Sequence, residues 1–183
     1  MAVGGRWILI ATLGGNAANA SPAGDTAPAL LVSGGSVLLA SRSGTRTVPL
    51  DRFWTAYRRI DAQPDEIIVS FRLPRKGSAR ERFRKIGTRR AQAISKVMAA
   101  SRIRIVKGRV TSAAIALGSI APTPVRLSAV ESLLVGQKLT PALIDEAEQL
   151  AQATVQPIDD IRSSADYRRW ASGRLVRDAL ENL

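Results

Sequence analysis

The chain has 183 residues with a net charge of +12, and it contains neither cysteine nor histidine. These absences exclude a disulfide framework, a thiolate nucleophile, a cysteine-held iron–sulfur cluster, a zinc site and a histidine-based triad. If the chain takes part in catalysis, we expect a bound cofactor to supply the chemistry. Hydrophobic residues (45%) and charged residues (23%) are balanced as in a soluble globular protein. The length fits one domain or two small ones. No apolar run approaches the roughly 18 residues that cross a bilayer.

The first well-marked segment runs from Thr12-Leu13-Gly14-Gly15-Asn16 to Asp25. Two adjacent glycines let a ligand approach the backbone, whose amides can bind phosphate or carbonyl oxygens. On pattern alone an ordinary turn is favoured, because Gly-Gly and Gly-Asn are common turn pairs. Asp25 can accept hydrogen bonds from ligand hydroxyls, and it can also cap a helix over residues 26–31.

The segments that follow alternate between strand signals and turn signals. The elements predicted here are a hairpin of residues 37–40 and 47–50 about Ser43-Gly44, a short helix capped by Asp51 that reaches Tyr57, and a strand over residues 67–71 that Pro74 ends. The Arg/Lys/Gly/Ser stretch of residues 75–80 predicts a linker. We therefore place a domain boundary there, between residues 1–75 and 76–183.

The second part begins with strands and ends with helices. The predicted strands are residues 83–86, 102–105 and 110–117, the last two joined by a turn at Lys107-Gly108, and the predicted helices begin at Thr123-Pro124, at Thr140-Pro141 and at a capping box of Ser163 and Asp166. Strands followed by helices indicate an α+β fold in which a three-stranded antiparallel sheet carries helices on one side.

A run of cations links the two parts. Residues 76–120 alone hold 12 basic and 1 acidic side chains. The basic belt comprises Arg72, Arg75, Lys76, Arg80, Arg82, Arg84, Lys85, Arg89 and Arg90. A solvated face is the commonest explanation of such a run, and binding of nucleic acid, of a diphosphate cofactor or of an acidic partner subunit are the alternatives. Aromatic residues (4%) are too few for single-strand stacking platforms, and no helix-turn-helix pattern is present, so we expect no nucleic acid.

The ordered motifs together resemble those of a known family. They are Thr12 to Asn16, residues 20–26, 46–50 and 64–68, Lys85-Ile86-Gly87-Thr88-Arg89-Arg90 with residues 91–96, Ala116-Leu117-Gly118-Ser119-Ile120-Ala121-Pro122 with residues 123–126, and Pro157-Ile158-Asp159-Asp160-Ile161-Arg162 with residues 163–164. In this order they resemble the FAD-binding (medium) subunit of molybdenum hydroxylases, the xanthine dehydrogenase and carbon monoxide dehydrogenase family. The resemblance covers nearly all of the chain after residue 11.

The resemblance implies an electron-relay function. FAD would take electrons from iron–sulfur clusters on one partner subunit, which receives them from a molybdopterin subunit, and would pass them to NAD or to another acceptor. The positions that match the family's cofactor contacts are Thr12, Leu13, Gly14, Gly15 and Asn16 in a flavin loop, Asp25 at FAD hydroxyls, Ile68 near the flavin ring, and Lys85 beside the isoalloxazine system. The family implies no catalytic side chain and no metal site on this chain.

The family also implies a lobe of roughly a hundred residues before this point, with a glycine-rich loop for the FAD diphosphate. We therefore expect the C-terminal part of a two-lobe FAD-binding domain followed by the small C-terminal domain, in a truncated subunit. An alternative is a non-catalytic interaction module that docks on partner subunits without FAD. The stretch from Arg6 to Ala20 also resembles a short signal peptide, but cleavage there would split the flavin segment, so a cytoplasmic location is expected.

Overall fold

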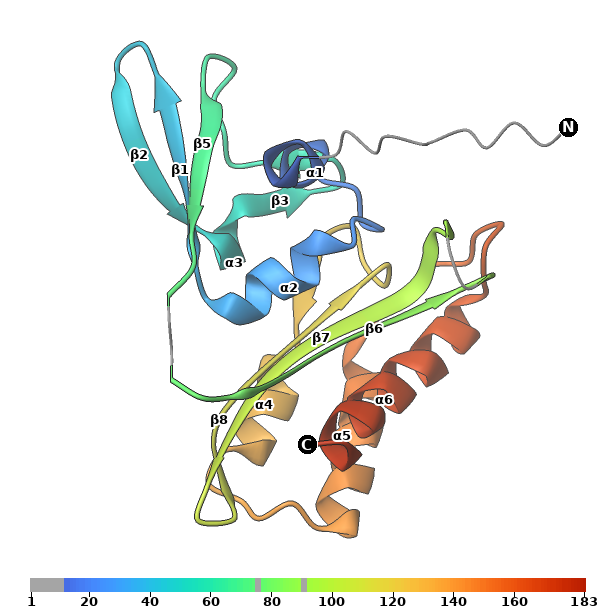
Figure 1. The fold of residues 1–183 in the computed structure, drawn as a ribbon. Coiled ribbons are helices and arrows are strands. Elements are labelled where there is room, and N and C mark those ends of the chain that lie inside the picture. The colour runs from blue at the N-terminus through green and yellow to red at the C-terminus, as the bar shows by residue number, and fades with distance from the viewer. Residues whose placement is uncertain (1–11, 75–76, 90–91) are drawn as a thin grey trace, which may run out of the picture.

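The computed structural model describes residues 12–74, 77–89 and 92–183. The N-terminal part combines short helices with two small sheets (Figure 1). Its elements are α1 (Leu13–Asn19), α2 (Thr26–Ser33), β1 (Ser36–Ser41), β2 (Gly44–Pro49), α3 (Leu50–Phe53), β3 (Trp54–Ala56), β4 (Arg59–Ile60) and β5 (Ile67–Arg72). Strands β2, β1 and β5 form an antiparallel sheet in that order, and β3 pairs with β4. The linker predicted over residues 75–80 begins outside the described residues, so the boundary stays a prediction.

The β1–β2 hairpin confirms the sequence prediction. Val37 and Leu39 alternate with half-buried neighbours, and Val37 pairs with the buried Val48 across the hairpin. This alternation is what a strand with one buried face requires. The helix predicted from Asp51 to Tyr57 was wrong in extent, because α3 is a single turn that ends at Phe53 and the chain then continues directly into β3.

The C-terminal part is a sheet followed by three helices. Its elements are β6 (Arg80–Gly87), β7 (Ser95–Val106), β8 (Arg109–Gly118), β9 (Val125–Arg126), α4 (Ser128–Leu134), α5 (Pro141–Thr154) and α6 (Ala165–Glu181). The sheet is antiparallel in the order β6-β7-β8-β9. Its three long strands include the three predicted, although β7 begins seven residues before the predicted start. A short fourth strand lies where the sequence indicated the start of a helix. Because Val125 and Arg126 pair with β8, that helix begins only at Ser128.

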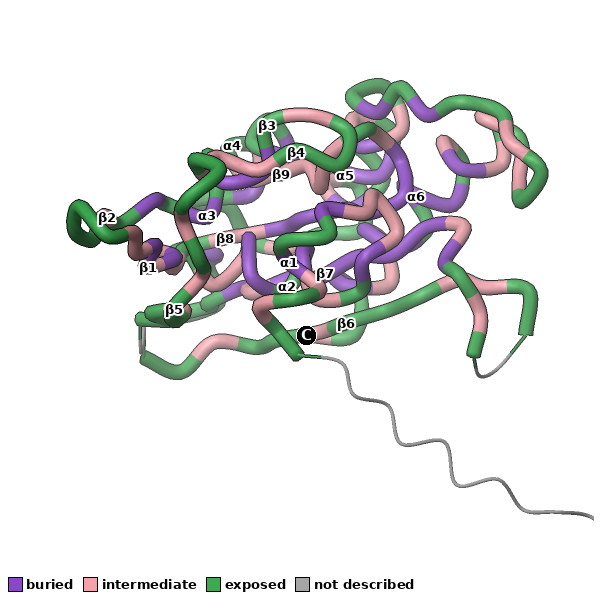
Figure 2. Tube along the Cα trace, turned by 90° about the horizontal axis from the view of Figure 1, so that it is seen from above, coloured by how far each residue is buried: buried purple, intermediate pink, exposed green. Residues whose placement is uncertain are grey.

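The helices of the C-terminal part lie on one face of its sheet, as predicted, and α2 of the N-terminal part covers the other face. Figure 1 shows α4, α5 and α6 against one face and α2 against the other. On the α2 face, Pro28 lies so close to Gly118 that an added Cβ there would stand 3.1 Å from the proline ring. The residues of β7 from Val97 to Ser101 are consequently buried on both sides, as the unbroken buried segment in Figure 2 shows.

Two helix caps illustrate how far local sequence decides the boundaries. The Thr140 side chain accepts a hydrogen bond from the Leu143 amide at 3.2 Å, with Pro141 in the first turn, as predicted. The last helix is capped by Ser164, whose hydroxyl accepts from the Tyr167 amide at 3.2 Å. The predicted cap at Ser163 was therefore one residue too early.

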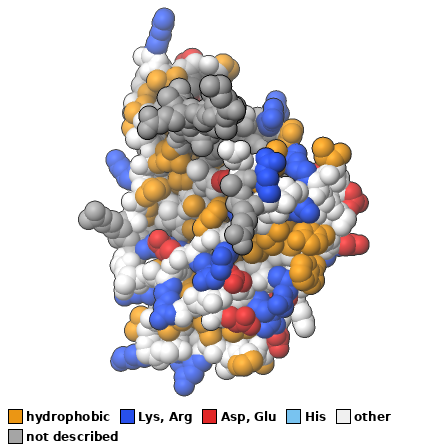
Figure 3. Space-filling view, turned by 45° about the vertical axis from the view of Figure 1, so that its right-hand side comes forward, with side chains coloured by type: hydrophobic (Ala, Val, Ile, Leu, Met, Phe, Trp, Pro, Cys, Tyr) orange, Lys and Arg blue, Asp and Glu red, His pale blue; other side chains and the backbone are white. Residues whose placement is uncertain are grey.

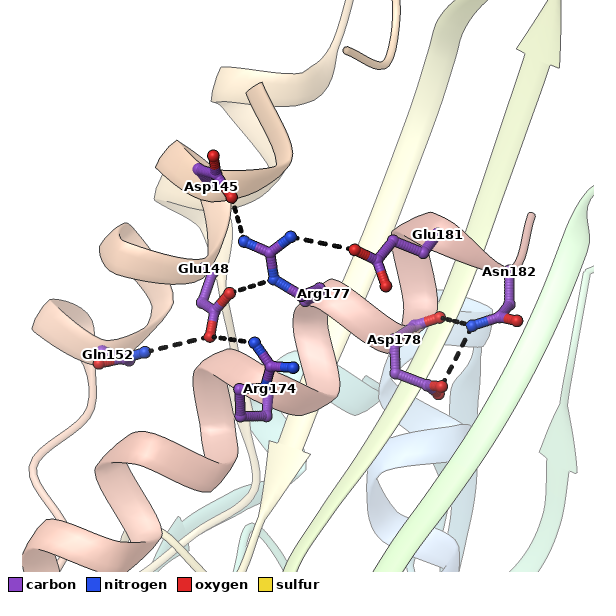
Figure 4. A network of polar contacts seen from close by, with 8 residues as sticks. All are labelled: Asp145, Glu148, Gln152, Arg174, Arg177, Asp178, Glu181 and Asn182. Carbon is purple, nitrogen blue, oxygen red and sulfur yellow. Dashed lines mark hydrogen bonds and ion pairs between the residues drawn. The ribbon is translucent and has the colours of Figure 1, made fainter. Parts of the chain in front are cut away.

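Helices α5 and α6 are joined by a network of ion pairs around the buried Glu148 (Figure 4). Arg177 donates to Glu148 and to Asp145, and Arg174 donates to Glu148 at 3.4 Å. Hydrogen bonding to Asp145 and Glu148 raises the pKa of Arg177, so this side chain stays charged throughout the stable range of the protein. The network fixes the crossing of the two helices that cover the sheet.

Candidate cofactor site

The segment with the paired glycines forms a helix rather than the turn favoured on sequence. Thr12 is the N-cap of α1, and its hydroxyl accepts a hydrogen bond from the Gly15 amide at 2.9 Å. A Cβ on Gly15 would stand 2.9 Å from that same hydroxyl, so glycine is needed to make the cap. The amides of Leu13 and Gly14 lie in the first turn, where no carbonyl of the helix can accept from them. Such amides can bind an acceptor from outside the helix.

A tertiary contact stabilises this glycine-containing helix. Ala17 is buried, and its carbonyl accepts a hydrogen bond from the Trp54 indole at 3.1 Å. Glycine is a poor helix former, and α1 has only seven residues, so the helix depends on such packing. The sequence interpretation failed here because Trp54 lies 37 residues away along the chain.

A tight turn then leads from α1 to Asp25. Ala20 ends α1 in a left-handed conformation, and the Gly24 amide donates to the Ser21 carbonyl at 2.9 Å. A Cβ on Gly24 would lie 3.1 Å from that carbonyl and 3.3 Å from the Asn16 side-chain oxygen. The same Asn16 oxygen accepts a hydrogen bond from the Thr26 hydroxyl. The side-chain amide of Asn16 thus orients the start of α2.

The carboxylate at that start serves an ion pair rather than a helix cap. Asp25 occupies the N-cap position of α2 but makes no side-chain cap bond, so the predicted capping role was wrong. Its carboxylate instead accepts from the Lys85 ammonium at 2.6 Å. The side chains of Lys85 and Asp25 are 27% and 48% exposed, so both charges remain within reach of a ligand.

The eight residues predicted as cofactor contacts converge in space. Thr12 to Asn16 form the N-cap and first turn of α1, and a Cβ on Gly14 would stand 3.8 Å from a methyl group of Ile68. Asn16 bonds the residue after Asp25, and Asp25 bonds Lys85. A hollow of about 400 Å³ lies beside these contacts, and two of the eight residues, Leu13 and Asp25, line it. Sequence reasoning missed Leu73 and Phe83, which line the same hollow. Strand alternation could have identified Phe83, since it shares a face of β6 with Lys85.

Three members of the basic belt form ion pairs within the molecule. Arg82 and Arg84 both pair with Asp178 on α6, at 2.9 and 3.2 Å, and Lys85 pairs with Asp25. Burial raises the pKa of Asp178, but hydrogen bonds from the two arginines outweigh it and hold that pKa below its ordinary value. Figure 3 shows Lys and Arg side chains spread over the face in view, several with acidic side chains beside them. This arrangement favours the solvated-face interpretation of the belt. Arg75, Lys76 and Arg90 lie outside the described residues.

Three further features considered in the sequence are a membrane span, a metal site and an export signal. Among the described residues, no helix is long and apolar enough to span a membrane. In the same ranges, no three carboxylates gather closely enough to hold a metal ion. Residues 1–11, which contain the start of the pattern that resembles an export signal, lie outside the described part of the chain.

Family models match the two parts of the chain separately. Residues 9–76 match the FAD binding domain in molybdopterin dehydrogenase, and residues 82–183 match the CO dehydrogenase flavoprotein C-terminal domain. Among similar sequences, the carbon monoxide dehydrogenase medium chain of Afipia carboxidovorans is 31% identical over 93% of this chain and 59% of its own length. The xanthine dehydrogenase FAD-binding subunit of Escherichia coli O157:H7 is 28% identical over 87% of this chain and 55% of its own length.

Solved structures agree with these matches. Carbon monoxide dehydrogenase from Hydrogenophaga pseudoflava superposes with a TM-score of 0.89 at 28% identity, over 93% of this chain and 60% of that one. Quinoline 2-oxidoreductase from Pseudomonas putida 86 gives a TM-score of 0.86 at 25% identity, over 93% of this chain and 59% of that one. The chain thus spans less than two thirds of the length of these relatives. It belongs to the family of FAD-binding medium subunits of molybdenum hydroxylases, together with carbon monoxide and xanthine dehydrogenase flavoprotein subunits.

Proposed function

We propose that this chain is an FAD-binding electron-transfer subunit of a xanthine dehydrogenase-type molybdenum hydroxylase. The observation that carries the proposal is that Leu13 and Asp25 line one hollow, with Lys85 paired to Asp25 and Ile68 next to Gly14. The contacts among these residues join parts of the chain up to 60 residues apart, which supports a shared role in binding one ligand.

The donor set of the site fits a flavin. The ring of a flavin has an apolar edge and a polar edge with carbonyl and nitrogen acceptors, and its ribityl chain carries hydroxyls. In the hollow, Leu13, Leu73 and Phe83 supply apolar surface. The first-turn amides of Leu13 and Gly14 supply donors, as does the Lys85 ammonium beside Asp25, and the Asp25 carboxylate supplies acceptors for hydroxyls.

Each residue then has a distinct role. The α1 amides would hold polar acceptors of the cofactor, Asp25 would orient hydroxyls, and Ile68 would pack against the ring. Lys85 would place positive charge near the ring, which favours the more negative form that a flavin takes on reduction. When bound, FAD supplies the two-electron redox chemistry that the side chains of this chain cannot provide.

The partners follow from the same proposal. Electrons would arrive from an iron–sulfur subunit, which would in turn receive them from a molybdopterin subunit, and would leave to NAD or another acceptor. A chain without cysteine cannot hold an iron–sulfur cluster by thiolates, which agrees with clusters on a separate subunit.

A titration with FAD tests the proposal. We expect the purified chain to quench FAD fluorescence on binding, and the Asp25→Asn/Lys85→Met double variant to bind at least tenfold more weakly. Lys138→Met, a change in an exposed loop before α5, serves as the control and should leave the affinity unchanged. The proposal fails if the chain binds no FAD either alone or together with the N-terminal portion of a relative. Capture of partner subunits without flavin would then support the interaction module.

A further inference from the structure

The turn that carries Asp25 is tied to the C-terminal domain by a backbone hydrogen bond. The Ser119 amide, just beyond β8, donates to the Pro22 carbonyl at 2.9 Å. Pro22 lies within the tight turn closed by the bond from the Gly24 amide to the Ser21 carbonyl. Whatever fixes Ser119 therefore also fixes the approach of the chain to Asp25.

Ser119 has an unusual conformation that its surroundings must maintain. Its φ angle is +65°, in the left-handed region that residues with a Cβ rarely adopt. Its hydroxyl lies 2.6 Å from the Ser95 hydroxyl, in a buried pair. Its carbonyl accepts a hydrogen bond from the Arg168 guanidinium, through Nη1, at 3.1 Å. Such a conformation persists only where several contacts determine it together.

Arg168 is the buried charge at the centre of these contacts. It lies on α6 and is only 4% exposed. Its Nη2 donates to Asp160 at 2.6 Å, which neutralises the guanidinium and orients it toward Ser119. Burial raises the pKa of Asp160, but hydrogen bonds from the Arg162 amide and from Arg168 hold that pKa below its ordinary value. The Asp160 carboxylate is thus ionised at neutral pH.

We propose that Arg168 is a positioning residue for the flavin site: through Ser119 and Pro22 it holds the turn that presents Asp25 to the cofactor. The proposal rests on the proposed function for its flavin part. Arg168 does not itself line the hollow at Asp25, and it acts across 49 residues of sequence by fixing the Ser119 carbonyl. Asp160 keeps the guanidinium in place.

Amide hydrogen exchange and FAD titration on the same variants test this inference. Arg168→Lys keeps the charge beside Asp160 but cannot reach both Asp160 and the Ser119 carbonyl with a planar fork. We expect exchange in residues 20–30 to accelerate about tenfold relative to α5, and the FAD dissociation constant to rise about tenfold. Arg174→Lys is the matched control, since Arg174 lies on the same helix and contacts Glu148 instead. It should change both quantities less than twofold.

A milder variant covers the case in which Arg168→Lys does not fold. Asp160→Asn leaves Arg168 in place but removes the charge that orients it, so the same amides should exchange faster, by a smaller factor. Exchange in residues 20–30 that follows the α5 amides in these variants would refute the positioning role. Faster local exchange with unchanged FAD affinity would refute the link to the flavin. Failure of the unsubstituted chain to bind FAD would refute the proposed function, while the exchange data would still decide whether Arg168 holds the turn.

Discussion

Replacing Lys85 by methionine separates its structural role from its proposed redox role. The Lys85–Asp25 pair is short, at 2.6 Å, but both side chains are partly exposed. Pairs of this kind contribute about 0.2–1 kcal/mol to stability. In a chain of this size that corresponds to a loss of at most about 4 °C in melting temperature. The fold should therefore tolerate Lys85→Met.

The effect on a bound flavin should be larger. The interaction energy of two unit charges about 5 Å apart is roughly 3 kcal/mol at an effective dielectric constant of about 20. Asp25 offsets part of this field, so we expect a net change of about 1–3 kcal/mol. For a two-electron couple, a loss of this size in Lys85→Met lowers the flavin reduction potential by about 20–60 mV. The sign follows because a cation stabilises the more negative, reduced form.

Spectroelectrochemical titration of the FAD-loaded chain measures this shift. Lys138→Met removes one charge from a distant exposed loop and controls for the change in net charge. An equal shift in both variants, or no shift in Lys85→Met, would refute a specific role of Lys85. A melting temperature that falls by 10 °C or more would show that the ion pair is mainly structural.

Three further changes test the site and the fold. Gly15→Ala should weaken FAD binding and lower the free energy of unfolding by about 1 kcal/mol, because the new Cβ displaces the cap hydroxyl. Gly14→Ala, whose Cβ meets only a methyl group at 3.8 Å, should leave the apo fold intact. FAD titration and thermal melts compare the two variants. Hydrogen bonds from Arg46 and then from a backbone amide lower the pKa of Glu66 from 4.5 to about 2. The ionised Glu66 therefore stabilises the fold fully above pH 4.5, and this contribution disappears toward pH 2. In Glu66→Gln the free energy of unfolding should depend less on pH over that window. Glu148→Gln should lower the free energy of unfolding by about 2–4 kcal/mol, because Arg174 and Arg177 then lose their buried carboxylate partner; urea unfolding measures this loss.

These predictions have clear contrary outcomes. Equal FAD affinities for Gly14→Ala and Gly15→Ala would show that the cap does not organise the site. An unchanged acid limb in Glu66→Gln would assign acid unfolding to other carboxylates. Asp166→Asn, at a side chain that is 94% exposed, is the control for Glu148→Gln, and a similar loss in both would contradict a special role of burial.

Local sequence determined the elements whose signals are self-contained. The β1–β2 hairpin follows from apolar alternation about a glycine turn, and α5 follows from its Thr-Pro start. The ordered motifs also identified the family and the eight candidate residues of the cofactor site. Such patterns depend on neighbours within a few residues, whose conformational preferences a single sequence reveals.

The tertiary structure alone decided what depends on distant contacts. Gly14-Gly15-Asn16 is helical because Trp54 binds the far end of α1, and β7 is buried on both faces because α2 crosses from the N-terminal part. Asp25 pairs with Lys85, 60 residues away, instead of capping its own helix. These choices are made by packing and by the need to satisfy buried or charged groups, and no local pattern encodes which distant partner will satisfy them.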